Sequence, residues 1–149
     1  MTREVLIRVT GLHEQPGQDS DNLEMITTGD YFQKNGKHYI IYDEMMEGIE
    51  GSVRNTVKIS PQEMDIRKQG AIGAHMIFAP SQKSQTRYAT PMGEMLVELS
   101  TNEITLDEQE DSLKVCVNYS LDINYQHISN CNITMDICSR EKAQLQLTQ

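Results

Sequence analysis

The side chains best suited to binding chemistry lie near the ends of alternating segments or at glycine and proline corners: Glu44, Arg67, Arg87 and Tyr88. If those segments form a barrel, such positions lie at its mouth or point inward. An Arg guanidinium inside a small barrel can bind a carboxylate or phosphate head group through two parallel hydrogen bonds. The four residues are therefore the candidate ligand-binding group. The alternative is a structural Arg–Glu pair that closes the barrel.

Catalytic and metal chemistry have no comparable signal. The sequence contains no nucleophile elbow, phosphate-binding loop, dinucleotide fingerprint or zinc pattern. The spacing of the four histidines indicates no common site, so each is interpreted as a surface or structural residue: His13, His38, His75 and His127. The three cysteines lack metal-ligand spacing. We expect no metal and no cofactor, and no motif supports an enzymatic activity.

The composition describes an acidic chain. It has 149 residues, with 22 acidic and 13 basic side chains and a net charge of −9. Nucleic acids and anionic lipids bind clustered Lys and Arg, whereas the basic residues here are scattered singly. No apolar run approaches the roughly 18–20 residues that span a bilayer, and the N-terminus lacks an apolar core of signal-peptide length. We therefore expect neither nucleic acid nor a membrane as partner, and a cytoplasmic location.

The clearest structural signal is the segment Leu113–Tyr125. Its odd-numbered positions are apolar and form one face, while the even-numbered positions are mainly polar. Side chains alternate across a strand, so this segment is a long strand with one buried face. The length predicts a single domain, residues 1–149. We also expect a mobile loop at Gln15–Asn22 and a polar tail from about residue 141.

Asn35-Gly36 lies between two alternating segments, which is a strong hairpin signal. A two-residue turn there pairs Tyr31 with Ile40 and places both on one face with Tyr42. The opposite face of this hairpin is also partly apolar. The hairpin is therefore buried on both sides, or one face is covered by another element or a partner. Tyr31, Ile40 and Tyr42 are the candidate interaction face for a partner or a second copy of the chain.

A second hairpin is expected around Ser60–Glu63. Its register pairs Ile59 with Met64 and Val57 with Ile66 on one face.

Two further turns are expected later in the chain. Thr101-Asn102 is expected to turn the chain so that Leu99 meets Ile104. A three-residue loop after the long strand places Cys116 opposite Cys138, where oxidation could join the two strands.

The complete pattern contains eight to ten strands and no convincing helix. Many short strands with regular turns predict a sandwich or a barrel, and the long final pair favours an antiparallel up-and-down barrel. A barrel of about eight strands has an interior that side chains fill, or that holds one small ligand.

Several short motifs and the paired C-terminal strands together resemble a known family. In chain order the motifs are Ile7-Arg-Val-Thr-Gly11, Tyr39–Glu44, Arg67–Gly70, Phe78 and Tyr88-Ala-Thr-Pro-Met-Gly93. The layout resembles the YwiB-like family of small, uncharacterised bacterial proteins over nearly the whole chain. The resemblance implies a calycin-type barrel, the architecture of lipocalins and fatty-acid-binding proteins. It implies no activity and supplies no site residues.

Two functional hypotheses follow. The first is a barrel that binds a small, partly apolar ligand, favoured by nine Met, six Tyr and the hairpin with two apolar faces. The second is a non-enzymatic interaction module or homodimer that uses the face of Tyr31, Ile40 and Tyr42.

Overall fold

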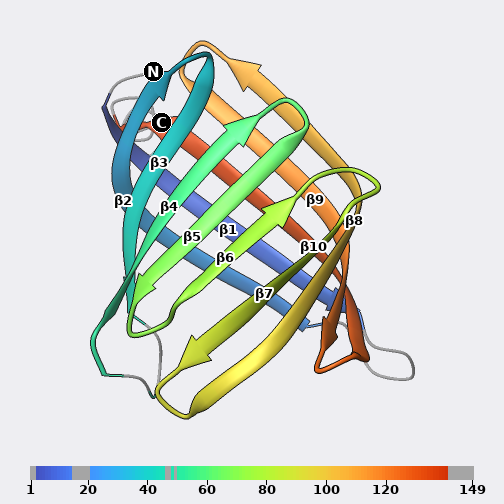
Figure 1. Ribbon diagram of the computed structural model, residues 1–149. Coiled ribbons are helices and arrows are strands. Elements are labelled where there is room, and N and C mark those ends of the chain that lie inside the picture. Colours follow the sequence, from blue (N-terminus) through green and yellow to red (C-terminus); the bar gives the residue numbers. More distant parts are fainter. Residues whose placement is uncertain (1–2, 15–20, 46–47, 49, 141–149) are drawn as a thin grey trace.

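The structure is a computed structural model that describes all residues except 1–2, 15–20, 46–47, 49 and 141–149 (Figure 1). The polar tail expected from residue 141 lies outside the described residues, as does most of the loop expected at residues 15–22. The last two residues of that expected loop, Asp21 and Asn22, instead begin a strand.

The described residues contain ten strands in one antiparallel sheet, as the alternation predicted. They are β1 Glu4–Glu14, β2 Asp21–Lys34, β3 Lys37–Met45, β4 Ser52–Ser60, β5 Glu63–Gly70, β6 Ala74–Phe78, β7 Lys83–Thr90, β8 Gly93–Gln109, β9 Ser112–Ile123 and β10 Gln126–Ser139. The strand order is β6-β5-β4-β3-β2-β1-β10-β9-β8-β7, so every neighbour is adjacent in sequence except β1 and β10. None of the described residues forms a helix long and apolar enough to cross a membrane.

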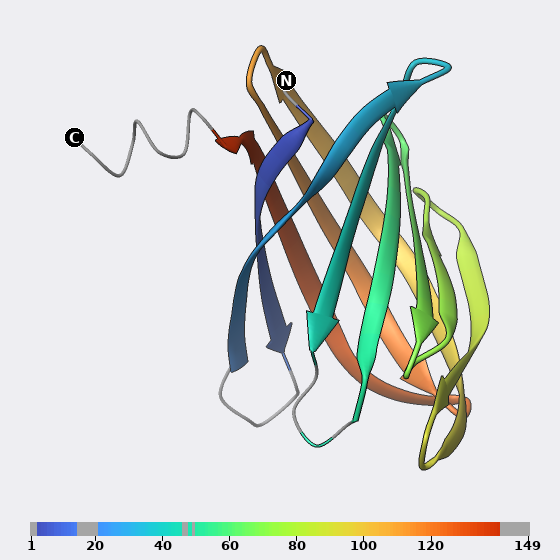
Figure 2. The same cartoon turned by 90° about the vertical axis from the view of Figure 1, so that its left-hand side faces the viewer.

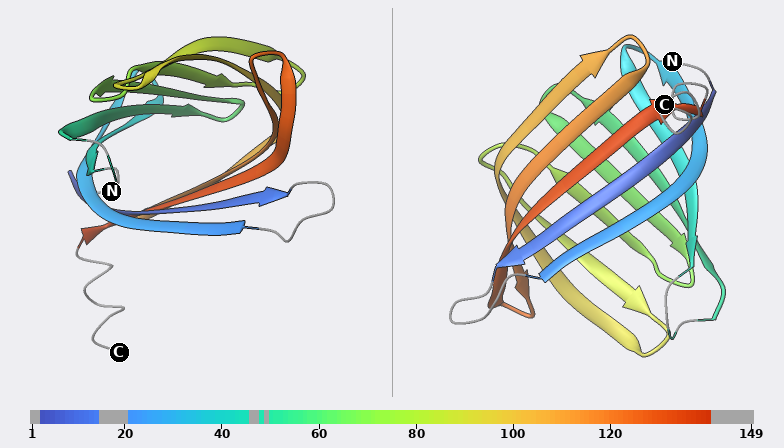
Figure 3. Two further views of the ribbon diagram at one scale, coloured as in Figure 1. Left: turned by 90° about the horizontal axis from the view of Figure 1, so that it is seen from below. Right: turned by 180° about the vertical axis from the view of Figure 1, so that it is seen from behind.

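The sheet curls into a nearly closed barrel (Figure 3). Its two outer strands, β6 and β7, meet at an isolated bridge between Gly73 and Ala89, with backbone hydrogen bonds of 3.0 and 2.8 Å. The backbone N–H of His75 also donates to Thr86 Oγ1 at 3.1 Å. Because closure removes the exposed edges of a sheet, these contacts complete the fold.

The two short hairpins have the predicted registers. Tyr31 pairs with Ile40, and Ile59 pairs with Met64. The turn residues Asn35 and Gly36 both have positive φ, 55° and 75°, as a two-residue hairpin turn requires.

The turn predicted at Thr101-Asn102 is wrong. β8 runs without interruption from Gly93 to Gln109 and pairs with β9 throughout, with a shift of register between Thr101 and Glu103. The extra residue forms a bulge that bends the strand instead of reversing it. The Thr101 backbone is held extended because its carbonyl accepts from Ser81 and its N–H donates to Gln82, at 3.1 and 3.2 Å.

The register predicted for the last two strands is also wrong. Cys116 faces Thr134, four positions from the expected Cys138, and none of the three cysteines forms a disulfide. The chain turns earlier than expected, at Asn124 and Tyr125, which have φ of 50° and 67°. Asn124 is held in this conformation because its Oδ1 accepts from the Leu96 N–H at 3.0 Å and its own N–H donates back to the Leu96 carbonyl at 2.8 Å.

Strands β2 and β3 are hydrogen-bonded to each other over only part of their length. β2 pairs with β3 from Asp30 onward, while the earlier residues of β2 pair with β1 alone. Figure 2 shows β2 and β3 diverging below this point. Gly29 lies at the divergence, where an added Cβ would stand 2.6 Å from the Ile41 carbonyl oxygen and 2.7 Å from Ile7 Cδ1. Only glycine allows the strands to approach so closely there.

The inward-facing residues fall into two groups. Near the β2–β3 and β8–β9 turns, tightly packed aliphatic side chains form what we call the packed half: Val5, Ile7, Ile40, Val57, Ile59, Met64, Leu113 and Ile137. Their exposed fractions are 0–2%. Near the β5–β6, β7–β8 and β9–β10 turns, the inward residues are mostly half-buried, and we call this part the hollow half.

Candidate ligand-binding site

The hollow half contains two adjoining cavities of about 270 and 230 Å³. Met76 and Tyr119 line both cavities. The larger is bounded mainly by apolar side chains such as Met25 and Ile133, and the smaller by Met95 and neighbouring aliphatic residues. Each volume lies just below the roughly 300 Å³ at which small-molecule pockets usually begin, so the two together offer room for one small ligand.

Gly11 on β1 lines the larger cavity, and an added Cβ there would meet no atom within 4 Å. Tyr119, which lines both cavities, packs its ring edge to face on the buried Phe78 at a centroid distance of 5.0 Å.

A charged network lies in the wall of the larger cavity. Lys68 Nζ donates to Glu44 Oε1 at 2.7 Å and to Asn55 Oδ1 at 2.8 Å, and Asn55 Nδ2 donates to Glu44 Oε1 at 3.0 Å. The three residues come from adjacent strands β3, β4 and β5, where Asn55 is the direct cross-strand partner of Lys68. The side chains of Lys68 and Glu44 are 13% and 16% exposed, and Asn55 is fully buried behind them.

This network keeps Glu44 ionised. Burial raises the pKa of the carboxyl, but the hydrogen bonds from Lys68 and Asn55 and the charge of Lys68 outweigh it, so that the pKa lies below its ordinary value. The pKa values of Tyr42 and Tyr88 are raised, mainly by burial and secondarily by the negative charge of Glu44. Burial also raises the pKa of Tyr119. The three tyrosines that line the cavities, Tyr42, Tyr88 and Tyr119, therefore carry neutral hydroxyls at physiological pH.

The four residues expected to form a ligand site do not come together. Glu44 and Tyr88 face the interior, and Tyr88 lines the smaller cavity. Arg67 and Arg87 are exposed on the outside, where Arg87 lies 3.7 Å from Glu94. The reason is the alternation of a strand, which points successive side chains to opposite faces. The expectation that these arginines place a guanidinium inside the barrel is therefore wrong. The cation that lines the interior cavity is Lys68.

Lys68 and Asn55 were missed, although the sequence carries a signal for both. Asn55 lies between Val53 and Val57 on the apolar face of its strand, and Lys68 follows Ile66 at the same spacing of two. A polar residue in register with a buried face is uncommon unless it is satisfied or functional. Searching for polar residues on apolar faces would have identified the pair.

The predicted interaction face is also corrected. Tyr31, Ile40 and Tyr42 are only 6%, 0% and 6% exposed, because they point into the barrel. The Tyr31 hydroxyl hydrogen-bonds His38 Nδ1 at 2.7 Å, and His38 Nε2 contacts Glu108 Oε1 at 2.9 Å. These contacts connect the β2–β3 hairpin to the end of β8 and close the packed half.

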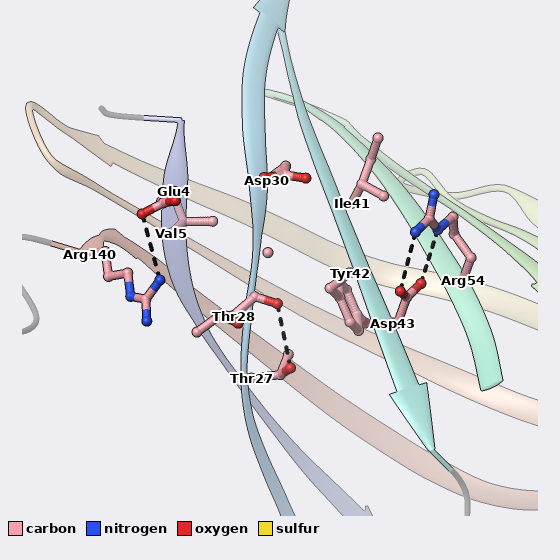
Figure 4. Close-up of a pocket in the computed structure, with 11 residues that line it drawn as sticks. Glu4, Val5, Thr27, Thr28, Asp30, Ile41, Tyr42, Asp43, Arg54 and Arg140 are labelled. Atoms are coloured by element: carbon pink, nitrogen blue, oxygen red, sulfur yellow. Dashed lines mark hydrogen bonds and ion pairs between the residues drawn. The ribbon is translucent and has the colours of Figure 1, made fainter.

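A further hollow of about 390 Å³ lies where β2 diverges from β3 (Figure 4). Each arginine there already contacts a carboxylate: Arg54 Nε and Nη2 donate to Asp43 at 3.0 and 3.2 Å, and Arg140 Nη1 lies 3.6 Å from Glu4. Both arginines of this groove are exposed and already paired, which leaves no spare cation for a ligand, so the interior cavities are the better candidate site.

Comparison with known proteins identifies the family. The model of a family described as "Domain of unknown function (DUF1934)" matches residues 7–135.

The chain belongs to this family.

A curated relative, "Uncharacterized beta-barrel protein YwiB" of Bacillus subtilis (strain 168), is 29% identical over 124 residues, which cover 80% of this chain and 86% of the relative. The crystal structure of the ywiB protein from Bacillus subtilis aligns with a TM-score of 0.80 at 26% identity, covering 92% of both chains. The YwiB-like resemblance and the all-β barrel are thus confirmed.

Proposed function

We propose that this protein binds a small, partly apolar molecule inside the hollow half of its barrel. The observation that carries the proposal is the pair of adjoining cavities lined by Met and Tyr, with an ion pair in the wall. Ligand pockets combine an apolar lining with a few polar groups that orient the ligand. A barrel that served only as a scaffold has no need of a charged network in its interior, where charges are costly to bury.

The surroundings of the hollow half also support binding. Three large apolar side chains are exposed in or beside the turns at this end of the barrel: Met45, Met92 and Tyr125, with exposed fractions of 79%, 90% and 77%. Apolar groups around an opening favour the partition of an apolar molecule from water. Methionine side chains are flexible, which allows the lining to adapt to ligand shape.

The proposal is tested with the uncharged fluorophore N-phenyl-1-naphthylamine, together with native mass spectrometry of the purified protein. We expect saturable fluorescence enhancement with one site per chain. Alternatively, the purified protein carries a bound molecule, seen as extra mass that is lost on denaturation, and this molecule competes with the fluorophore. Gly11→Met fills the larger cavity and should weaken fluorophore binding at least tenfold.

The matched control is Ile26→Met, which introduces the same side chain at a 58% exposed position on the outside of β2. It should bind as the wild type does. A wild-type protein that carries no extra mass and does not enhance fluorescence would overturn the proposal. Equal binding by the Gly11→Met variant and the wild type would overturn the placement in the larger cavity.

A further inference from the structure

We infer that the head group of the ligand is uncharged and both donates and accepts hydrogen bonds, as a hydroxyl or a primary amide does. The inference rests on the binding function proposed above and names the ligand class that the charged network in the cavity wall selects. It excludes carboxylate and ammonium head groups as the preferred ligands.

The first step is charge balance. Lys68 is the one cation among the described residues that line either cavity, and its ammonium already pairs with Glu44 at 2.7 Å. The other charged residue of the lining, Glu24, pairs with Arg8 on the outside at 2.9 Å. A ligand carboxylate would therefore meet Glu44 without a spare cation, and a ligand ammonium would meet Lys68. A buried charge without a partner is strongly unfavourable.

The second step is the count of donors and acceptors. An ammonium has three N–H donors, and two of those on Lys68 are directed to Glu44 Oε1 and Asn55 Oδ1. Both hydrogen bonds that Glu44 accepts from these neighbours end on Oε1, so Oε2 has no partner among the described residues. The network thus leaves one donor and one acceptor beside the cavity. A hydroxyl or a primary amide satisfies both at once.

The third step concerns the rest of the ligand. Beyond the network the larger cavity is lined mainly by apolar side chains such as Met25, Met76 and Ile133, and the adjoining cavity past Met76 is lined by Met95. These side chains carry no strong hydrogen-bonding group and suit a flexible hydrocarbon chain. The ligand class is therefore a neutral amphipathic molecule with a small polar head and an aliphatic body.

The experiment compares four probes with one chain length at pH 7: octan-1-ol, octanamide, octanoate and octylammonium. Dissociation constants are obtained by displacing N-phenyl-1-naphthylamine and checked by NMR titration of the protein amides. We expect the alcohol and the amide to bind at least tenfold more tightly than either charged probe. Octanoate or octylammonium binding as tightly as octan-1-ol would overturn the inference while leaving the proposed binding function intact. If the fluorophore binds but none of the four probes does, the inference falls, while the proposed binding function is decided by the fluorophore and the native mass.

Glu44→Gln sharpens the test by leaving the charge of Lys68 uncompensated. This variant should bind octanoate at least tenfold more tightly than the wild type does and should bind octylammonium more weakly. The matched control is Asp43→Asn, which changes the net charge equally but on the outer face, where Asp43 pairs with Arg54. It should keep the wild-type order of probes. An unchanged order in a folded Glu44→Gln variant would contradict the inference, and if that variant does not fold, the wild-type series decides alone.

Discussion

The two halves of this barrel share the same ten strands but have opposite interiors. In the packed half, side chains such as Ile7, Ile59 and Met64 are 0% exposed and fill the space between the strands. In the hollow half, the same strands present Met76, Tyr88, Glu44 and Lys68 at half-buried or partly buried positions around two cavities. Close packing and open interior space are thus separated along the barrel axis.

The difference teaches how one small sheet combines a filled core with a hollow interior. Close packing in one half removes its apolar side chains from water almost completely, and such burial is the main favourable contribution to folding. The other half can then remain underpacked and carry a charged network, because the barrel does not depend on it to the same extent. The region where β2 and β3 are no longer paired lies on the side of this hollow half.

The largest contrast is expected from matched methionines. Met64→Ala removes a side chain that is fully buried in the packed half, and should lower the free energy of unfolding by about 2–5 kcal/mol. Met76→Ala enlarges a cavity that already exists and should cost about 1 kcal/mol or less. Urea denaturation followed by circular dichroism measures both. Equal losses would show that the two halves do not differ in packing.

Two inward-facing glycines extend the contrast to the backbone. Gly29→Ala places a methyl group 2.6 Å from the Ile41 carbonyl oxygen and should destabilise the protein by about 1–3 kcal/mol. Gly11→Ala meets open space and should be neutral, or stabilising by about 0.4–1 kcal/mol through the unfolded chain. Thermal and urea unfolding of both variants provide the measurement. An unchanged free energy of unfolding in the Gly29→Ala variant would mean that the strands do not need to approach closely there.

The interior and exterior ion pairs form the next comparison. Lys68→Met leaves Glu44 buried without its cation and should lower the free energy of unfolding by about 1–3 kcal/mol. Arg54→Met breaks an exposed pair with Asp43 that solvent screens, and should have little effect on the free energy of unfolding. Adding Glu44→Gln to Lys68→Met should restore part of the loss, which a double-mutant cycle measures. No recovery would indicate that Lys68 acts through packing alone.

The smallest effect is expected in the dependence of stability on pH. The pKa of Glu44 is lower in the folded protein than its ordinary value of 4.5, so the unfolded state binds its proton first as the pH falls. The stabilisation from this carboxylate is present above about pH 4.5 and is lost as the pH falls through the folded pKa. Urea midpoints between pH 3 and 6 should therefore fall more steeply for the wild type than for Glu44→Gln. Parallel profiles would contradict this.

The sequence predicted much of the local structure because local rules decide it. Asn35-Gly36 specifies a tight turn, and the register of its hairpin follows from the turn geometry. Alternation also predicted which side chains share a face, including the long apolar face of β9. The candidate site was only half predicted: Glu44 and Tyr88 face the interior, whereas Arg67 and Arg87 face outward.

The wrong register at Cys116 shows the limit of such rules. The predicted and observed pairings of β9 and β10 differ by four residues, and both place the same side chains on the same faces. Because strand alternation has a period of two, any even shift preserves the pattern of apolar and polar faces. The pattern alone therefore contains no information that separates the two registers. The choice is made by Asn124, which adopts a left-handed conformation and hydrogen-bonds Leu96 on β8.

By itself, the sequence determined that the chain is an antiparallel all-β barrel and which side chains point into it. Only the tertiary structure decided that one end is filled and the other hollow. That distribution depends on the closure of β6 on β7, the divergence of β2 from β3 and the bend of β8, none of which the alternation of apolar and polar residues specifies. Alternation assigns a side chain to the interior, but the curvature of the closed sheet determines how much space it must fill.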